Sequence, residues 1–280
     1  MRRDYTISDL TAYINWVYFF HAWSVKADSG EGAQLLREAR KMLGEMMQPY
    51  VKIRTVVEIL PAYSDGDDIV VQKMMPCECG SSHPWGEPIR MPMLRQQNVG
   101  SDGYCRCLSD YIRPQSSLRQ DKIGAFATSV SVDAEAISSD DEYSLMLLQT
   151  LADRLAEAGA ERLHEEVRKT IWGYAPNENL SAEELHQGKY QGIRPAIGYP
   201  CLPDMSINFI LDEIVDFKSI GVTLTEHAMM QPHASVSGLM ISLPQAQYFS
   251  VGQIDETQVR DYARRRNMTL NEIKKYLPCC

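Results

Sequence analysis

Apolar residues recur at helical spacing in several parts of the chain, and each such stretch predicts a helix. Residues 9–23 place Trp16, Phe19, Phe20 and Trp23 on one helical face, and residues 31–47 repeat the pattern with leucine and methionine. The sequence at 139–142 has the form of a capping box, and the apolar stripe that follows, beginning at Leu145, extends to Trp172. This predicts a single helix about 50 Å long at about 1.5 Å per residue. Further helices are expected after Ser181, at 206–219, around 256–266 and after Thr269.

Segments rich in β-branched and aromatic residues predict the strands. They lie at 55–60 and 69–72, on either side of a turn at 64–67, and at 123–132, 222–225, 235–242 and 248–254. Residues 74–90 are expected to be irregular. Helices and strands interleave without a regular βαβ rhythm, so the chain is predicted to form an α+β fold around an antiparallel or mixed sheet.

Composition and charge narrow the class of protein. The 280 residues are 44% hydrophobic and 23% charged, which is typical of a globular chain of one large domain or two small ones. The formal net charge of -9 argues against a nucleic-acid partner. No apolar run approaches membrane-spanning length and no signal-peptide core follows the N-terminus. We therefore expect a cytoplasmic protein with its seven cysteines reduced.

Several familiar catalytic motifs are absent from the sequence. There is no Gly-x-Gly-x-x-Gly after a strand, no phosphate-binding Gly-Lys-Ser/Thr loop and no Gly-x-Ser-x-Gly elbow. His164-Glu165-Glu166 lacks the second histidine of a helical zinc site. Dinucleotide-binding, P-loop and serine-hydrolase classes are thus not supported.

Two Cys-x-Cys pairs, at residues 77–79 and 105–107, form a candidate metal site. Four thiolates can hold a structural zinc, but structural zinc sites use Cys-x2-Cys or longer spacing. A thiol or zinc module is therefore an alternative that the spacing disfavours, and Cys279-Cys280 is interpreted as a frayed tail.

The segment 191–200 carries the strongest indication of a binding site. It combines Arg194 with two prolines, two glycines and Tyr199. Proline fixes φ and glycine allows close backbone approach, so a rigid loop of this kind can present amides and a guanidinium to a small anionic or zwitterionic molecule. An ordinary surface turn is the alternative interpretation, since proline and glycine mark such turns too.

Many ordered blocks of residues 94–277 resemble the C-terminal reactivation domain of cobalamin-dependent methionine synthase. Residues 9–72 match more weakly, and 74–90 looks like an insertion. The matching blocks are Leu94–Gln97, Cys107–Tyr111, Ile123–Ala127, Leu151–Ala158, Leu163–Glu165, Trp172–Ser181, Arg194–Pro203, Leu224–Glu226, Ala234–Gly238 and Asp261–Arg265.

This resemblance implies a fold and an activity. It implies that residues 1–280 form one C-shaped α+β domain, with a twisted antiparallel sheet, flanking helices and one long helix. It implies binding of S-adenosylmethionine and support for the reductive methylation of cob(II)alamin. Cobalamin would be carried by a partner, a methionine synthase module, and the electron would come from flavodoxin or a similar donor.

The resemblance also assigns site residues. Arg194 matches the arginine that holds the ligand carboxylate, for which a guanidinium is suited. Ala196 and Tyr199 match backbone contacts near the adenine, and Gly198 matches a position of close backbone approach. Glu157 matches an acidic contact and Tyr248 a tyrosine of the site; by pattern alone they would be a solvated helix face and an aromatic in a strand core.

Two positions depart from the family pattern. Asn15 stands where an aspartate faces the ligand's ammonium, and Gly188 stands where a glutamate can occur. Both changes remove negative charge near a cationic ligand. Asn15 alone is expected to weaken binding by about 1 kcal/mol, because hydrogen bonds to charged groups are stronger than neutral ones.

The sequence also lacks the Asp-x-His-x-x-Gly cobalamin signature and the homocysteine and methyltetrahydrofolate modules. The expectation is a protein that reactivates a separate methionine synthase in trans, and an excised fragment of a longer chain is the alternative. In either case the domain is not expected to make methionine alone. A non-catalytic module that binds S-adenosylmethionine or a corrinoid partner, and so regulates a methyltransferase, is the competing function.

Overall fold

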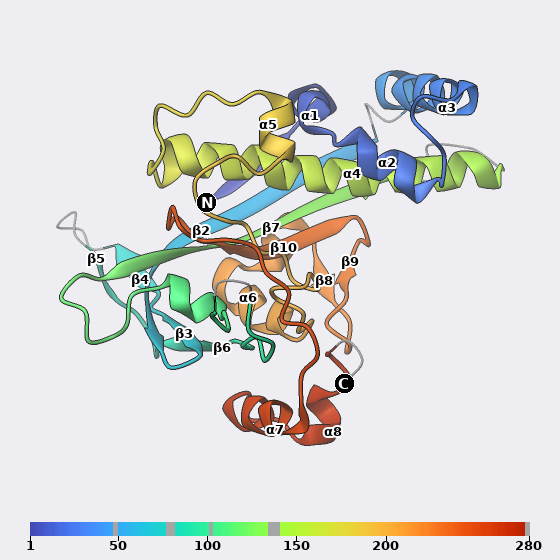
Figure 1. Cartoon of the computed structure of the whole chain (residues 1–280). Coiled ribbons are helices and arrows are strands. Elements are labelled where there is room, and N and C mark those ends of the chain that lie inside the picture. Colours follow the sequence, from blue (N-terminus) through green and yellow to red (C-terminus); the bar gives the residue numbers. More distant parts are fainter. Residues whose placement is uncertain (47–49, 77–81, 101–102, 134–140, 278–280) are drawn as a thin grey trace.

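The centre of the computed structural model is a curled, antiparallel six-stranded sheet (Figure 1). The structure describes residues 1–46, 50–76, 82–100, 103–133 and 141–277. The strand order of the six-stranded sheet is β10-β7-β2-β3-β6, and β1 also pairs with β2. These strands are β1 (Arg2–Tyr5), β2 (Val51–Asp65), β3 (Asp68–Val71), β6 (Ile89–Pro92), β7 (Asp121–Val132) and β10 (Ser235–Met240). The twisted antiparallel sheet that the resemblance implied is thus confirmed.

Helices cover both faces of this sheet. Figure 1 shows the long α4 across one face with α1, α2, α3 and α5 beyond it, and α6 on the opposite face. The helices are α1 (Ile7–Leu10), α2 (Trp16–Ala22), α3 (Gly30–Lys41), α4 (Glu142–Glu166), α5 (Ala182–His186), α6 (Ile207–Val215), α7 (Glu256–Arg265) and α8 (Leu270–Ile273). The 3-10 helices are η1 (Thr11–Tyr13), η3 (Leu108–Tyr111) and η5 (Phe217–Ile220), and the π-helical segments are η2 (Met42–Met46) and η4 (Val167–Ile171). Two small hairpins pair β4 (Met74–Pro76) with β5 (Ser82–Pro84) and β8 (Thr223–Leu224) with β9 (Met230–Gln231).

Strand β7 separates two hydrophobic cores. Its Ile123 and Ala125 belong to the core on the α6 side, whereas Phe126 and Val130 pack on the α4 side. Side chains alternate between the two faces of a strand, and both faces of this one are covered. That is why residues 123–130 form an unbroken run of buried residues.

Several predicted elements are confirmed. The long helix runs from Glu142 through η4 to Ile171, and capping boxes begin α5 at Ser181 and α8 at Thr269. The N-cap of α4 is Asp141, whose carboxylate accepts from the amides of residues 143 and 144. Residues 139 and 140 of the predicted capping box lie outside the described residues.

Four predictions were wrong in detail. The helix expected at 9–23 is divided at Ile14–Asn15, because Asn15 is extended and caps α2 through its side chain. Leu145 is 43% exposed, and the buried stripe of α4 begins at Leu147. Residues 248–254 form no strand but an irregular segment with a positive φ at Gly252. Residues 74–90, expected to be irregular, contain the β4–β5 hairpin and the start of β6.

The cysteine pairs give no metal site among the residues that the structure describes. Cys107 is buried, which raises the pKa of its thiol to about 11, and Cys105 is partly exposed. Cys77, Cys79, Cys279 and Cys280 lie outside the described residues. Within the described ranges no group of three or more potential ligands is close enough to hold a metal ion, and no helix is long and apolar enough to cross a membrane.

Candidate functional site

The predicted binding loop runs along the free edge of β10. Ile193 exchanges backbone hydrogen bonds of 2.9 Å with Ile241, and the carbonyl of Pro195 accepts from the amide of Leu239 at 2.9 Å. The loop approaches closely because Gly238 has no side chain. A Cβ there would lie 2.2 Å from the Pro195 oxygen. The sheet edge therefore fixes the backbone of the loop.

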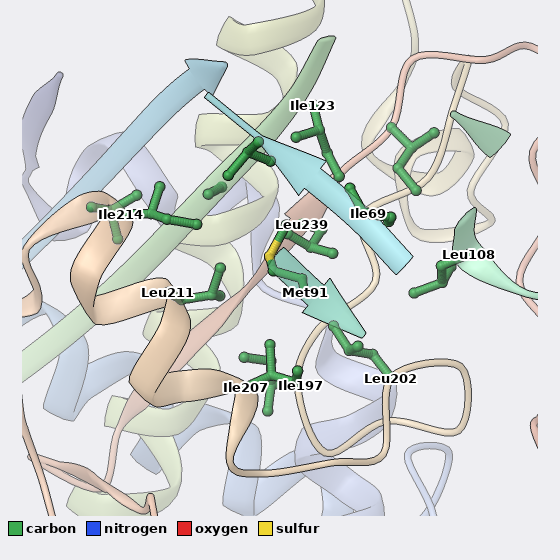
Figure 2. Close-up of a cluster of buried hydrophobic side chains, with 14 of the residues drawn as sticks. Ile69, Met91, Leu108, Ile123, Ile197, Leu202, Ile207, Leu211, Ile214 and Leu239 are labelled. Carbon is green, nitrogen blue, oxygen red and sulfur yellow. The ribbon is translucent and has the colours of Figure 1, made fainter. Parts of the chain in front are cut away.

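The far end of the loop is anchored in the core. Ile197 and Leu202 are buried beside Ile207 of α6, Met91 of β6 and Leu239 of β10 (Figure 2). This packing turns one side of the loop inward, and its other side is left to form a pocket.

Gly198 makes the turn between these two anchors. It has a φ of 85°, where a side chain would be strained, and its amide donates to the Leu202 carbonyl at 2.9 Å. A Cβ would lie 2.9 Å from Sδ of Met205. Gly198 is not among the residues that line the pocket, and its positive φ gives it a conformational role in the turn.

Helix α4 provides the facing side of the pocket. Arg154, Glu157 and Glu161 all line the pocket, and the two glutamates are one helical turn apart. The helix can lie close to β7 because Gly159 has no side chain. A Cβ at this position would lie only 2.8 Å from Cγ2 of Thr128. A glycine on the sheet-facing side thus sets the depth of the acidic side chains on the pocket side.

Arg194 joins the loop to α4 through its guanidinium. Its Nη1 donates to the carbonyl of Ala160 at 2.8 Å, and its Nη2 donates to Oε2 of Glu161 at 2.9 Å. Burial opposes the charged form, but the Glu161 carboxylate outweighs it, so the pKa of Arg194 is raised. Sequence reasoning assigned this cation to a ligand carboxylate and missed its internal partner.

Tyr199 makes a second link to α4. Its hydroxyl donates to Oε1 of Glu157 at 2.9 Å, and its side chain remains half exposed. Burial first, and then the charge of Glu157, raises the pKa of Tyr199 to about 12. The hydroxyl therefore stays protonated and can keep donating at neutral pH.

Two further tyrosines hold the start of the loop. The Tyr248 hydroxyl accepts from the Arg194 amide at 2.8 Å and lies 3.2 Å from the Tyr190 hydroxyl. Tyr248 is 51% exposed, so it is no strand-core aromatic. Tyr190 is one of the lining residues that sequence reasoning missed.

The remaining side of the pocket comes from the N-terminal helices and α5. The Asn15 Oδ1 atom accepts from the Val17 amide at 3.1 Å, so the side chain is engaged as the cap of α2. His186 of α5 is bonded through Nε2 to the Tyr13 carbonyl at 3.1 Å. Gly188 follows with a φ of 68° and open space where a Cβ would be. Both positions that depart from the family pattern therefore face the pocket.

A buried polar cluster supports the site from below. Arg168, which is fully buried, pairs with both carboxylate oxygens of Glu178 and lies over the Tyr190 ring at 4.4 Å. The His164 ring meets Tyr190 edge-on, and its Nε2 is 3.3 Å from the Tyr174 hydroxyl. Burial, followed by the charges of Arg194 and Arg168, lowers the pKa of His164 well below its ordinary value.

These elements line an open pocket of about 1100 Å³. That is large enough for a nucleoside-sized ligand, since small-molecule pockets are commonly about 300–1,000 Å³. Its lining combines polar, charged and aromatic side chains. The lining includes Tyr13, Asn15, Tyr18, His21, Arg154, Glu157, Glu161, His186, Gly188, Tyr190, Arg194, Ala196, Tyr199, Tyr248 and Phe249.

The structure thus brings together six of the seven sequence-predicted residues, all except Gly198. Arg154, Glu161 and Tyr190 were missed. The signal for the first two was present: positions 154, 157 and 161 have helical spacing on α4. Tyr190 had no comparable signal, because its place depends on how the segment after α5 folds back.

The curled sheet defines an α+β domain with a pocket between its long helix and a loop at the sheet edge. Residues 6–267 match the family described as "Vitamin B12 dependent methionine synthase, activation domain", and the chain belongs to this family. A solved structure described as the MetH reactivation domain bound to AdoHcy is similar to it, with a TM-score of 0.88 and 38% identity. The match covers 99% of this chain and 88% of that one.

Proposed function

We propose that the pocket binds S-adenosylmethionine and that the domain supports reductive methylation of cob(II)alamin held by a cobalamin-carrying methionine synthase module. The observation that carries this proposal is the convergence of Arg194, Glu157, Tyr199 and Tyr248 on one cavity in a chain of this family. The AdoHcy in the similar structure is the molecule that remains once S-adenosylmethionine has given up its methyl group, which supports the same ligand class.

The chemistry of the pocket suits this ligand. S-Adenosylmethionine has a zwitterionic amino-acid end, a cationic sulfur and an aromatic base. Arg194 and Glu161 offer paired charges of opposite sign, and Tyr18, Tyr199 and Tyr248 offer aromatic surface. Ala196 lies on the same loop and contributes backbone to the lining.

One electron from flavodoxin or a similar donor, together with the methyl group of S-adenosylmethionine, converts cob(II)alamin to methylcobalamin and releases S-adenosylhomocysteine. In this scheme the residues of this chain bind and orient the methyl donor, and they supply no general acid or base. Tyr18 and Tyr199 line the pocket and are exposed.

The experiment has two parts. Calorimetric titration with S-adenosylmethionine tests binding. Mixing the protein with a cobalamin-carrying methionine synthase module, a reductant and S-adenosylmethionine then tests transfer through the loss of the cob(II)alamin spectrum. Persistence of that spectrum with binding intact would favour a regulatory binding module instead, and failure to bind would contradict the whole proposal.

A further inference from the structure

Glu161 is the most deeply placed charged residue on the pocket side of α4. The residue is 8% exposed, and its Oε2 accepts from Nη2 of Arg194 at 2.9 Å. Its Oε1 is buried and has no hydrogen-bond partner among the described residues. A buried carboxylate with one unused oxygen is costly, so its retention here needs a reason.

The pocket is balanced in charge. Apart from its histidines, four of its lining residues carry a charge: Arg154 and Arg194 are cationic, and Glu157 and Glu161 are anionic. Removal of Glu161 would leave Arg194 as an uncompensated cation, 12% exposed, at the side of the cavity. Such a charge acts strongly because the surroundings are of low dielectric and salt screens it little.

We propose that Glu161 is a specificity-determining residue of this pocket: it positions Arg194 and cancels its charge, and so admits a ligand with a cationic centre. This inference rests on the proposed function. S-Adenosylmethionine differs from S-adenosylhomocysteine by a methyl group and one positive charge on sulfur. The pair of ligands therefore reports the electrostatic effect of Glu161 separately from its packing.

The test compares both ligands by calorimetry with the full chain and its Glu161→Gln variant. Glutamine has nearly the same shape and still offers an oxygen to Arg194, so the main change is the loss of charge. The expected result is that affinity for S-adenosylmethionine falls about tenfold further than affinity for S-adenosylhomocysteine, equivalent to about 1.4 kcal/mol. A Glu161→Asp variant, which restores the charge, is expected to recover the preference.

Glu166→Gln is the matched control. Glu166 belongs to the same helix and pairs with Arg162 and Arg3, away from the pocket. This control removes the same charge, and the ratio of the two affinities should stay as in the wild type.

An equal loss for both ligands in Glu161→Gln would show a merely structural role and overturn the inference. An unchanged ratio, or the same change of ratio in the Glu166→Gln control, would also overturn it. Failure of the wild-type chain to bind either ligand would instead contradict the proposed function, so the two failures are distinguishable.

Discussion

The hydroxyl of Tyr199 donates to the carboxylate of Glu157 at 2.9 Å and so ties the loop at the sheet edge to the long helix. We expect Tyr199→Phe to lower the free energy of unfolding by about 1 kcal/mol at most, since a single hydrogen bond contributes about that much and this one is half exposed. Chemical denaturation would measure the change. A larger loss would mean that the tyrosine also supports the core.

The same contact predicts how the pKa of the Tyr199 hydroxyl depends on Glu157, which an absorbance titration can measure. Burial and the charge of Glu157 raise the pKa of Tyr199 to about 12. In Glu157→Gln the carboxylate is gone, so the pKa should fall toward the ordinary value of about 10. Subtracting the tyrosinate absorbance of Tyr199→Phe isolates this group. An unchanged pKa would show that burial alone causes the shift.

Gly238 is expected to be intolerant of a side chain. In Gly238→Ala the new Cβ would meet backbone, the Pro195 oxygen at 2.2 Å and the Ala196 Cα at 2.8 Å, so the loop must move. We expect a loss of about 2 kcal/mol in unfolding free energy, as for overpacked cores, together with weaker ligand binding. Gly30→Ala is the control, because open space surrounds that position. Normal ligand affinity in Gly238→Ala would contradict the role given to the sheet edge.

His164 predicts a pH dependence of stability. Its folded-state pKa is lowered, first by burial and then by Arg194 and Arg168, so the unfolded chain takes up a proton that the folded chain does not. Stability should therefore fall as pH falls below about 6.5, by up to about 1.4 kcal/mol per pH unit. His164→Gln should flatten this slope. Equal slopes between pH about 5.5 and 7.5 in both proteins would contradict the assignment.

Asn15 offers a gain-of-function test of the proposed ligand site. Aspartate caps helices as well as asparagine does, so Asn15→Asp should keep α2 intact while adding a negative charge beside the pocket. The affinity for S-adenosylmethionine should rise about fivefold, which corresponds to recovery of the expected loss of about 1 kcal/mol. Calorimetric titration measures it. An affinity that does not rise would count against a role for position 15 near the ligand's ammonium.

Local signals in the sequence were sufficient for most helices and strands. The long helix, the two capping boxes and the central strand β7 follow from spacing and from residue type, because these elements satisfy their own periodicity. Interruptions within an element were harder to predict. At Asn15 an extended backbone interrupts an aromatic stripe that would otherwise fit one helix, and the choice between cap and helix interior depends on what packs around it.

The sequence by itself determined the family, the long helix and the loop around Arg194. Only the tertiary structure decided that Arg194 is paired with Glu161 and that Gly238 lets the loop lie on β10. The physical reason is distance along the chain. A helical or strand period records neighbours a few residues apart, whereas the pairing of residues 161 and 194 depends on burial and on the close approach of backbones that the whole fold sets.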